Sequence, residues 1–230
     1  MSVEPSGPAS DNPESLTFVI GTEVPLPGGA RVDSHGDIAA TTAANAAATL
    51  QAHESAFVDA GLGDVQALVS GLVVQPGVEF GPMTVYHLPL DRSFDLRSVM
   101  MRWPNLALEA HSTDYQKPAA YPRLAELGFA YQKVGPALTF AWRQAIYALD
   151  QMLSFLQGSA PIVIPTMERI MLENAGAWQS HYQGEPNTKF AQRHLALADR
   201  IRYYWPHPDA QAAVSALMTA MESQTLNRSV

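Results

Sequence analysis

Polar side chains of the types that bind metals and sugars follow apolar segments of the chain, at the point where each segment ends. Glu23 comes after the first such segment and His111 after the third. If these segments are parallel strands, their carboxyl ends meet at one edge of a sheet, where an imidazole nitrogen and carboxylate oxygens could share a divalent cation such as zinc. Such an ion could polarise a sugar carbonyl and stabilise an enediolate. In the alternative interpretation, His111 and Asp114 cap the next helix and Glu23 pairs with an arginine.

A second set of polar residues suits sugar phosphates. Lys133 and Gly135 end the fourth apolar segment, where a lysine and backbone N–H groups at a helix start could bind phosphate. If it were desolvated, Lys133 could also form a Schiff base. Gln75 and Glu79 could hydrogen-bond sugar hydroxyls, although a turn at Pro76 and Gly77 explains the same pattern. A strand-end lysine without a chemical role is the alternative for Lys133.

Composition excludes several classes of function. Fourteen basic and 22 acidic residues give a net charge of −8, which disfavours nucleic-acid and anionic-membrane partners. The chain has no cysteine, which excludes thiol catalysis and thiolate metal sites. Neither a G-x-x-x-x-G-K-[ST] nor a G-x-S-x-G motif occurs. No apolar run approaches the roughly 20 residues of a membrane helix, and no signal peptide is visible, so we expect a cytoplasmic protein.

The basic aromatic segment at residues 200–206, RIRYYWP, resembles a nucleic-acid-binding patch. At this net charge we expect instead a packed helix end whose arginines lie on nearby carboxylates.

The elements that would position these residues alternate between strands and helices. Expected strands cover 16–20, 67–74, 106–110 and 130–134; expected helices cover 43–60, 95–101, 118–127 and 136–157. In the last helix, apolar residues recur at helical spacing: Leu138, Ala141, Ala145, Leu149, Met152 and Leu156. Near-continuous apolar strands indicate a parallel sheet covered by helices on its outer face.

Four strand–helix units over residues 16–157 match half of a (β/α)₈ barrel, which takes about 250 residues. The predicted fold is therefore α/β, a partial TIM-barrel-like fold of four parallel strand–helix units plus C-terminal helices. Residues 1–15 are expected to form a disordered tail, and residues 158–230 a C-terminal helical extension. A doubly wound sheet would also explain the alternation, although no G-x-G-x-x-G motif follows a strand.

Five segments read together resemble one known family: residues 19–25 with 27–30, 73–80, 109–116, 133–140 and 200–206. They are similar to the non-catalytic (GatZ/KbaZ-type) subunit of class II D-tagatose-1,6-bisphosphate aldolase. The resemblance implies a TIM-barrel-like subunit of galactitol or N-acetylgalactosamine catabolism, which accompanies a separate zinc-dependent aldolase chain. Some relatives are instead described as metal-dependent ketose C4-epimerases.

By this resemblance, Glu23 and His111 match metal-binding positions, and Asp114 and Gln116 are candidate substrate contacts. Combined with the strand-end reasoning, the candidates divide by role. The catalytic candidates are Asp114 and Lys133; the substrate-binding candidates are Gln75, Glu79, Gln116 and Gly135; the metal-ligand candidates are Glu23 and His111.

Members of this family begin with another stretch of comparable size, to which nothing here corresponds. Four parallel strands cannot close a barrel, because closure links strand number, tilt and shear. The first and fourth strands would expose unpaired backbone groups at their edges. We therefore expect a C-terminal half or a truncated product, inactive alone and completed by a separate N-terminal barrel half or by self-association. A catalytic aldolase subunit is the other expected partner.

Overall fold

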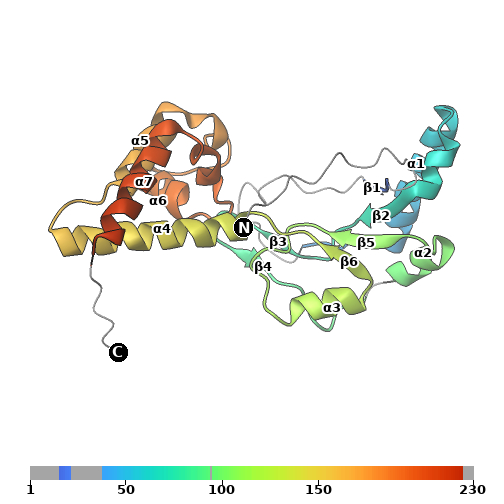
Figure 1. Cartoon of the computed structure of the whole chain (residues 1–230). Helices are drawn as coiled ribbons and strands as arrows, with labels where there is room; N and C mark the ends of the chain where they lie inside the picture. The colour runs from blue at the N-terminus through green and yellow to red at the C-terminus, as the bar shows by residue number, and fades with distance from the viewer. Residues whose placement is uncertain (1–15, 22–37, 94, 225–230) are drawn as a thin grey trace, which may run out of the picture.

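The computed structural model describes residues 16–21, 38–93 and 95–224. The predicted tail at residues 1–15 and the metal-ligand candidate Glu23 lie outside these ranges. The described chain forms a sheet unit and a helical unit, and the long helix α4 extends from the first into the second (Figure 1). Within the described ranges, no helix combines the length and the apolar character needed to cross a bilayer.

The sheet unit is built on four parallel strands in the order β1-β2-β5-β6. These strands are β1 (Phe18–Ile20), β2 (Val69–Val73), β5 (Ala107–Ala110) and β6 (Phe129–Gln132). The predicted α/β class with four parallel strands is confirmed. Over the residues that the structure describes, β1 and β6 each pair with one strand, so these four strands form an open sheet.

Three helices and one 3₁₀ turn complete the sheet unit: α1 (Ala43–Asp59), η2 (Gly63–Leu68), α2 (Leu96–Arg102) and α3 (Ala120–Glu126). Thr42 begins α1 as its N-cap, because its hydroxyl accepts a hydrogen bond from Asn45 N at 3.2 Å. Leu50 of α1 and Leu124 of α3 join the strand residues Leu72, Leu108 and Phe129 in one buried core. The apolar faces of α1, α2 and α3 therefore pack on the sheet, as predicted for these three helices.

A short antiparallel hairpin, β3 (Glu79–Phe80) and β4 (Val85–Tyr86), follows β2 and was not predicted. Each of its strands has two residues, which is too short for a period-2 pattern to be visible. The hairpin matters for the site because it places Glu79 near the carboxyl ends of the main strands.

The helical unit has its own core. It contains α4 (Pro136–Gln157), α5 (Val163–Glu173), η3 (Ala175–Ala177), α6 (Pro186–Leu195), η4 (Arg200–Tyr204) and α7 (Pro208–Glu222). Gly158 ends α4 in the left-handed conformation, with φ of 63°, as a glycine after a helix commonly does. Ile146, Met167, Ile170, Ile201 and Leu217 are buried together at the centre of this unit.

Helix α4 differs from the expected arrangement. It was predicted to cover the sheet, but it extends away from the end of β6, and α5 and α7 pack along one of its sides (Figure 1). Its buried residues are Pro136, Arg143, Ile146, Asp150 and Leu153. The apolar series that the sequence suggested as the sheet-facing side is exposed or half-buried. The division at residue 157 stays a prediction, although α4 shares its core with the C-terminal helices.

Candidate functional site

Three polar side chains meet at the carboxyl ends of β5 and β6. His111 Nε2 lies 2.5 Å from Glu109 Oε1, and Lys133 Nζ lies 3.7 Å from the same oxygen. The Glu109 and His111 side chains are only 11% and 15% exposed, whereas the Lys133 side chain is 65% exposed. The cluster therefore presents one accessible ammonium group beside a partly buried carboxylate–imidazole pair.

Glu109 was not among the predicted site residues. It stands two positions before His111, and residues i and i+2 of an extended chain point to the same side. That spacing was the available signal in the sequence. A carboxylate that accepts a hydrogen bond from one imidazole nitrogen fixes the tautomer and the orientation of the ring.

Of the two metal-ligand candidates, one lies in the described part of the chain. His111 is at the strand end as expected, but its Nε2 atom contacts Glu109, and Glu23 lies outside the described residues. The described part of the chain holds no group of three His, Asp or Glu side chains placed to bind one metal ion. His111 and Glu109 supply an imidazole and a carboxylate, two groups that bind divalent metals. A zinc or similar ion at this site stays a proposal.

Glu79 is a buried carboxyl group near these residues, with an exposed fraction of 8%. Burial raises its pKa, and the nearby Asp114 carboxylate acts in the same direction, against hydrogen bonds from Phe80 N, at 2.9 Å, and from Ser112. A carboxyl group with a raised pKa can exchange a proton nearer to neutral pH than an exposed one. Glu79 therefore has the property of a general acid or base.

Asp114 has a structural role that the sequence analysis left open. Its Oδ1 atom accepts hydrogen bonds from Gly135 N at 2.8 Å and Ala137 N at 2.9 Å, at the start of α4. The alternative in which His111 and Asp114 cap the next helix is therefore not borne out: α3 has no side-chain cap, and Asp114 instead accepts hydrogen bonds from N–H groups at the start of α4. The Gly135 N–H, a predicted phosphate donor, is used by this carboxylate. The residues on either side of the Thr113–Asp114 pair, Ser112 and Tyr115, have φ of 54° and 61°.

The two glutamine candidates also use their amides within the fold. Gln75 Oε1 accepts from Gly77 N at 2.8 Å and Val78 N at 2.9 Å, which closes the turn after β2. Gln116 Oε1 accepts from Leu88 N at 3.0 Å, and its Nε2 atom donates to Tyr86 O at 3.0 Å. Gln116 is 6% exposed. These contacts favour the turn interpretation for Gln75 and a bracing role for Gln116.

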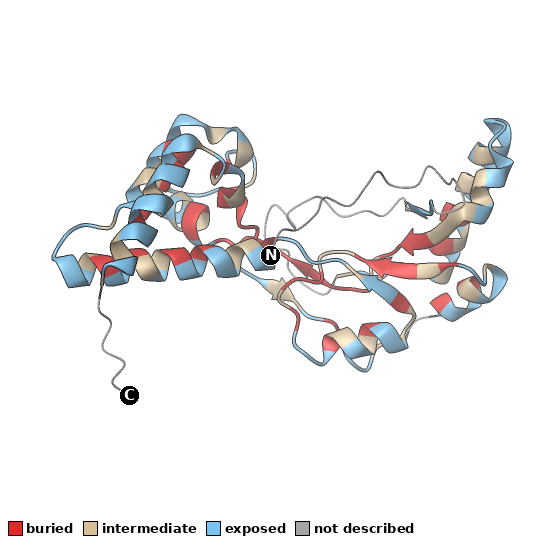
Figure 2. Cartoon of the chain, viewed as in Figure 1, coloured by how far each residue is buried: buried red, intermediate tan, exposed pale blue. Residues whose placement is uncertain are grey.

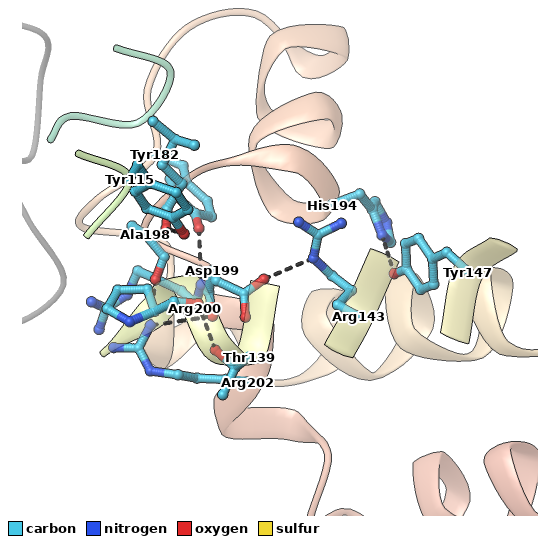
Figure 3. Close-up of polar contacts among 12 residues, drawn as sticks. Tyr115, Thr139, Arg143, Tyr147, Tyr182, His194, Ala198, Asp199, Arg200 and Arg202 are labelled. Atoms are coloured by element: carbon cyan, nitrogen blue, oxygen red, sulfur yellow. Dashed lines mark hydrogen bonds and ion pairs between the residues drawn. The ribbon is translucent and has the colours of Figure 1, made fainter. Parts of the chain in front are cut away.

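A second polar cluster lies inside the helical unit (Figure 3). Arg143 Nε donates to Asp199 Oδ1 at 2.7 Å, and the Tyr147 hydroxyl lies 2.6 Å from His194 Nδ1. On its other side, His194 Nε2 lies 3.0 Å from Glu168 Oε2, which also accepts from Arg193 Nε at 2.8 Å. These residues are separated by up to 56 positions along the chain, and no sequence spacing indicated that they meet.

The basic aromatic segment forms the 3₁₀ helix η4. Arg200 Nε donates to Ala177 O, and Arg202 donates to Ala198 O. The Tyr203 ring lies under both guanidinium groups, 5.1 Å and 4.5 Å from their centres. A packed helix end was expected, and the structure adds that the two arginines are bonded to backbone carbonyls where carboxylates were expected.

An open parallel sheet with polar side chains at its carboxyl edge defines an α/β protein whose candidate site lies at the strand ends. The family model of the D-tagatose-1,6-bisphosphate aldolase subunit GatZ/KbaZ-like proteins matches residues 5–230. The chain belongs to this GatZ/KbaZ-like family.

Individual relatives agree with this assignment. The chain is 44% identical over 213 residues to a D-tagatose 6-phosphate 4-epimerase of Agrobacterium fabrum, covering 91% of this chain and 49% of the relative. It is 42% identical to the D-tagatose-1,6-bisphosphate aldolase subunit GatZ of Klebsiella pneumoniae, covering 92% of this chain and 50% of that subunit. The chain thus spans about half the length of the curated relatives it matches.

A solved structure has the same fold. The crystal structure of a probable tagatose 6 phosphate kinase from Sinorhizobium meliloti 1021 matches with a TM-score of 0.79 and 39% identity. The match covers 91% of this chain and 51% of that one. The arrangement of both units therefore has a counterpart in a solved protein.

Proposed function

We propose that this chain acts as an accessory subunit of a class II D-tagatose-1,6-bisphosphate aldolase. The observation that carries the proposal is the 42% identity to a GatZ subunit over 92% of the chain. In this role the chain would support a separate catalytic subunit. The open edges of β1 and β6 would pair with a further polypeptide segment, in keeping with relatives of about twice this length.

The strand-end cluster supports a sugar phosphate as the small-molecule ligand. The exposed Lys133 ammonium offers positive charge for a phosphate group, and Glu109 holds it near His111. The remaining ring nitrogen of His111 is an acceptor in the neutral ring and suits a sugar hydroxyl, and the protonated form of Glu79 is a donor suited to a sugar hydroxyl or carbonyl oxygen. If a divalent ion is bound, His111 and Glu109 are the described residues that would hold it, and the ion would supply Lewis acidity.

The aldolase proposal is tested by reconstitution. The catalytic aldolase subunit is assayed for D-tagatose 1,6-bisphosphate cleavage with and without this chain. We expect the added chain to raise the activity or thermal stability of the catalytic subunit, and to cleave nothing measurable alone. Lys133→Met should weaken the effect of sugar phosphate on the complex, whereas Lys117→Met, at an exposed lysine, should not. No change on adding the chain would contradict the proposal.

A second candidate is a ketose-phosphate C4-epimerase, favoured by the 44% identical relative of that name and by the raised pKa of Glu79. A carboxyl group whose pKa is raised above its ordinary value suits the proton transfers of an enediolate-type reaction. Epimerisation of D-tagatose 6-phosphate is assayed with added divalent metal ions. The His111→Ala variant should lose this activity and the exposed His87→Ala control should keep it; equal activity in both would remove this candidate.

A further inference from the structure

The helical unit meets the sheet unit mainly through loops. Over the residues that the structure describes, the extensive contacts of α5, α6, η4 and α7 are with one another and with α4. Leu197, in the loop between α6 and η4, makes two hydrogen bonds to the sheet unit. Its carbonyl oxygen accepts from the Tyr115 hydroxyl at 2.7 Å, and its N–H donates to Pro82 O in the β3–β4 hairpin at 2.8 Å. Figure 3 shows Tyr115 next to Ala198, the residue that follows Leu197. We call Tyr115, Leu197 and Pro82 the Leu197 clasp.

The surroundings of the clasp are aromatic and buried. The Tyr115 ring packs edge-to-face on Phe80 of the hairpin and on Phe140 of α4, with 5.5 Å and 5.6 Å between ring centres. Asp114, which precedes Tyr115, is 2% exposed, and Ala198 is 4% exposed. Buried segments therefore meet where the two units join (Figure 2). Loss of the tyrosine hydroxyl would leave the carbonyl oxygen at this junction without its donor, which is unfavourable where water has little access.

Tyr115 also holds a backbone conformation that a tyrosine rarely adopts. Its φ is 61°, and that of Ser112 in the same loop is 54°. A left-handed conformation costs free energy in a residue with a Cβ atom, so it persists only where surrounding contacts hold it. The same loop carries polar groups of the candidate site: Ser112 hydrogen-bonds to Glu79, and Asp114 accepts from N–H groups at the start of α4. The loop thus lies between the clasp and the strand-end site.

We propose that the Leu197 clasp couples the helical unit to the strand-end site, with Tyr115 as the positioning residue. While the helical unit is docked, Leu197 O holds the Tyr115 hydroxyl, and the loop keeps Ser112 and Asp114 in place. Release of the hydroxyl lets Tyr115 leave its left-handed conformation, which moves Asp114 away from the start of α4. Because coupling is reciprocal, contacts that hold the strand-end loop also hold the helical unit docked.

Amide hydrogen exchange, measured residue by residue by NMR, tests this coupling. Tyr115→Phe keeps the ring and removes only the hydroxyl. We expect exchange to become more than tenfold faster on both sides of the clasp. On one side this is the Leu197 N–H, and on the other the Ala137 N–H, which donates to Asp114. Exchange of the Ile170 N–H, in the core of the helical unit, should stay unchanged because the unit remains folded.

Tyr121→Phe is the matched control. The Tyr121 hydroxyl donates to Thr113 O at 3.1 Å, so it binds the same loop from α3, inside the sheet unit. Its removal should leave exchange of the Leu197 N–H unchanged. Asp114→Ala tests reciprocity, because loosening the loop from its other end should make exchange at Leu197 more than threefold faster.

Three results would overturn the coupling. The first is faster exchange in Tyr115→Phe at Leu197 or at Ala137 but not at both, which would give the hydroxyl a local structural role. The second is equal acceleration at Ile170, which would indicate general destabilisation. The third is unchanged exchange at Leu197 in Asp114→Ala, or acceleration there in Tyr121→Phe as large as in Tyr115→Phe. The proposal does not depend on the proposed function, because exchange is measured without substrate or partner.

Discussion

Arg143 and Asp199 form a buried ion pair that joins α4 to the start of η4. Their side chains are 1% and 0% exposed, and the Nε to Oδ1 distance is 2.7 Å. The guanidinium group also lies 4.3 Å from the centre of the Phe140 ring. Asp199 holds the left-handed conformation, with φ of 44°, that turns the chain into η4. The pair thus fixes how the C-terminal segments return to the long helix.

Breaking this pair should destabilise the helical unit strongly. Arg143→Met leaves the Asp199 carboxylate buried without its cation, and removal of one partner of a buried pair costs about 3–5 kcal/mol. We expect urea denaturation to show a loss of this size. Arg169→Met is the matched control, because Arg169 pairs with Asp209 at the surface and should change stability little. A loss no larger for Arg143 than for Arg169 would show that the buried pair does not stabilise the unit.

Asp114 should act through the start of α4. Asp114→Ala removes the acceptor for Gly135 N and Ala137 N, and loss of a capping acceptor costs about 0.5–2 kcal/mol. Asp114→Asn keeps an oxygen acceptor and should cost less. Urea denaturation measures the free energy of unfolding of both variants and shows which loses more stability. If Asp114 were instead a catalytic carboxylate, both variants would lose activity in the assembled enzyme equally, whatever their stability.

The stability of the helical unit should depend on pH through His194. Burial lowers the pKa of His194, although Glu168 opposes the shift; Arg193 and Arg143 add to it. A lowered pKa means that the folded state favours the neutral ring, whose Nδ1 atom can accept from the Tyr147 hydroxyl. The stability is therefore fully present above the ordinary pKa of 6.5 and is lost as the pH falls below it.

Two variants separate this titration from the hydrogen bond. His194→Gln should flatten the dependence of the unfolding free energy on pH below 6.5. Tyr147→Phe should cost about 1 kcal/mol for the lost hydrogen bond and retain the pH dependence. An unchanged pH slope in His194→Gln would assign the dependence to another group.

The sequence predicted the sheet unit well because local patterns dominate there. Apolar runs ended by glycine or polar residues located the four parallel strands, and Thr42 located the start of α1. The strand-end position of His111 followed from the same reasoning, because strand order along the chain brings carboxyl ends to one edge. Its partner Glu109 was missed, although the two-residue spacing was present in the sequence.

The direction of α4 and the partners of the site residues could not be predicted in this way. An apolar stripe indicates that a helix has something to pack against, but it does not say which of two faces meets the chain's own core. In α4 the internal face carries Arg143 and Asp150, whose burial depends on Asp199 and on the N–H groups at the start of α5. Such long-range partners leave no periodic signal. For the same reason, the sequence did not indicate the hydrogen bonds that the side-chain amides of Gln75 and Gln116 form within the fold.

Glu79 should make the sheet unit less stable as the pH rises. Burial raises its pKa above 4.5, so the folded state favours the protonated carboxyl. The resulting stability is present below pH 4.5 and is lost as the pH rises through the higher pKa of the folded state.

Glu79→Gln keeps an oxygen to accept from Phe80 N and cannot ionise, so it should be at least as stable as the wild type at neutral pH. Urea denaturation at pH 5 and pH 8 measures this, with exposed Glu54→Gln as the control for loss of one charge. A Glu79→Gln variant that is less stable than wild type at pH 8 would indicate that the hydrogen bonds from Phe80 N and Ser112 stabilise the ionised carboxylate by more than burial penalises its charge.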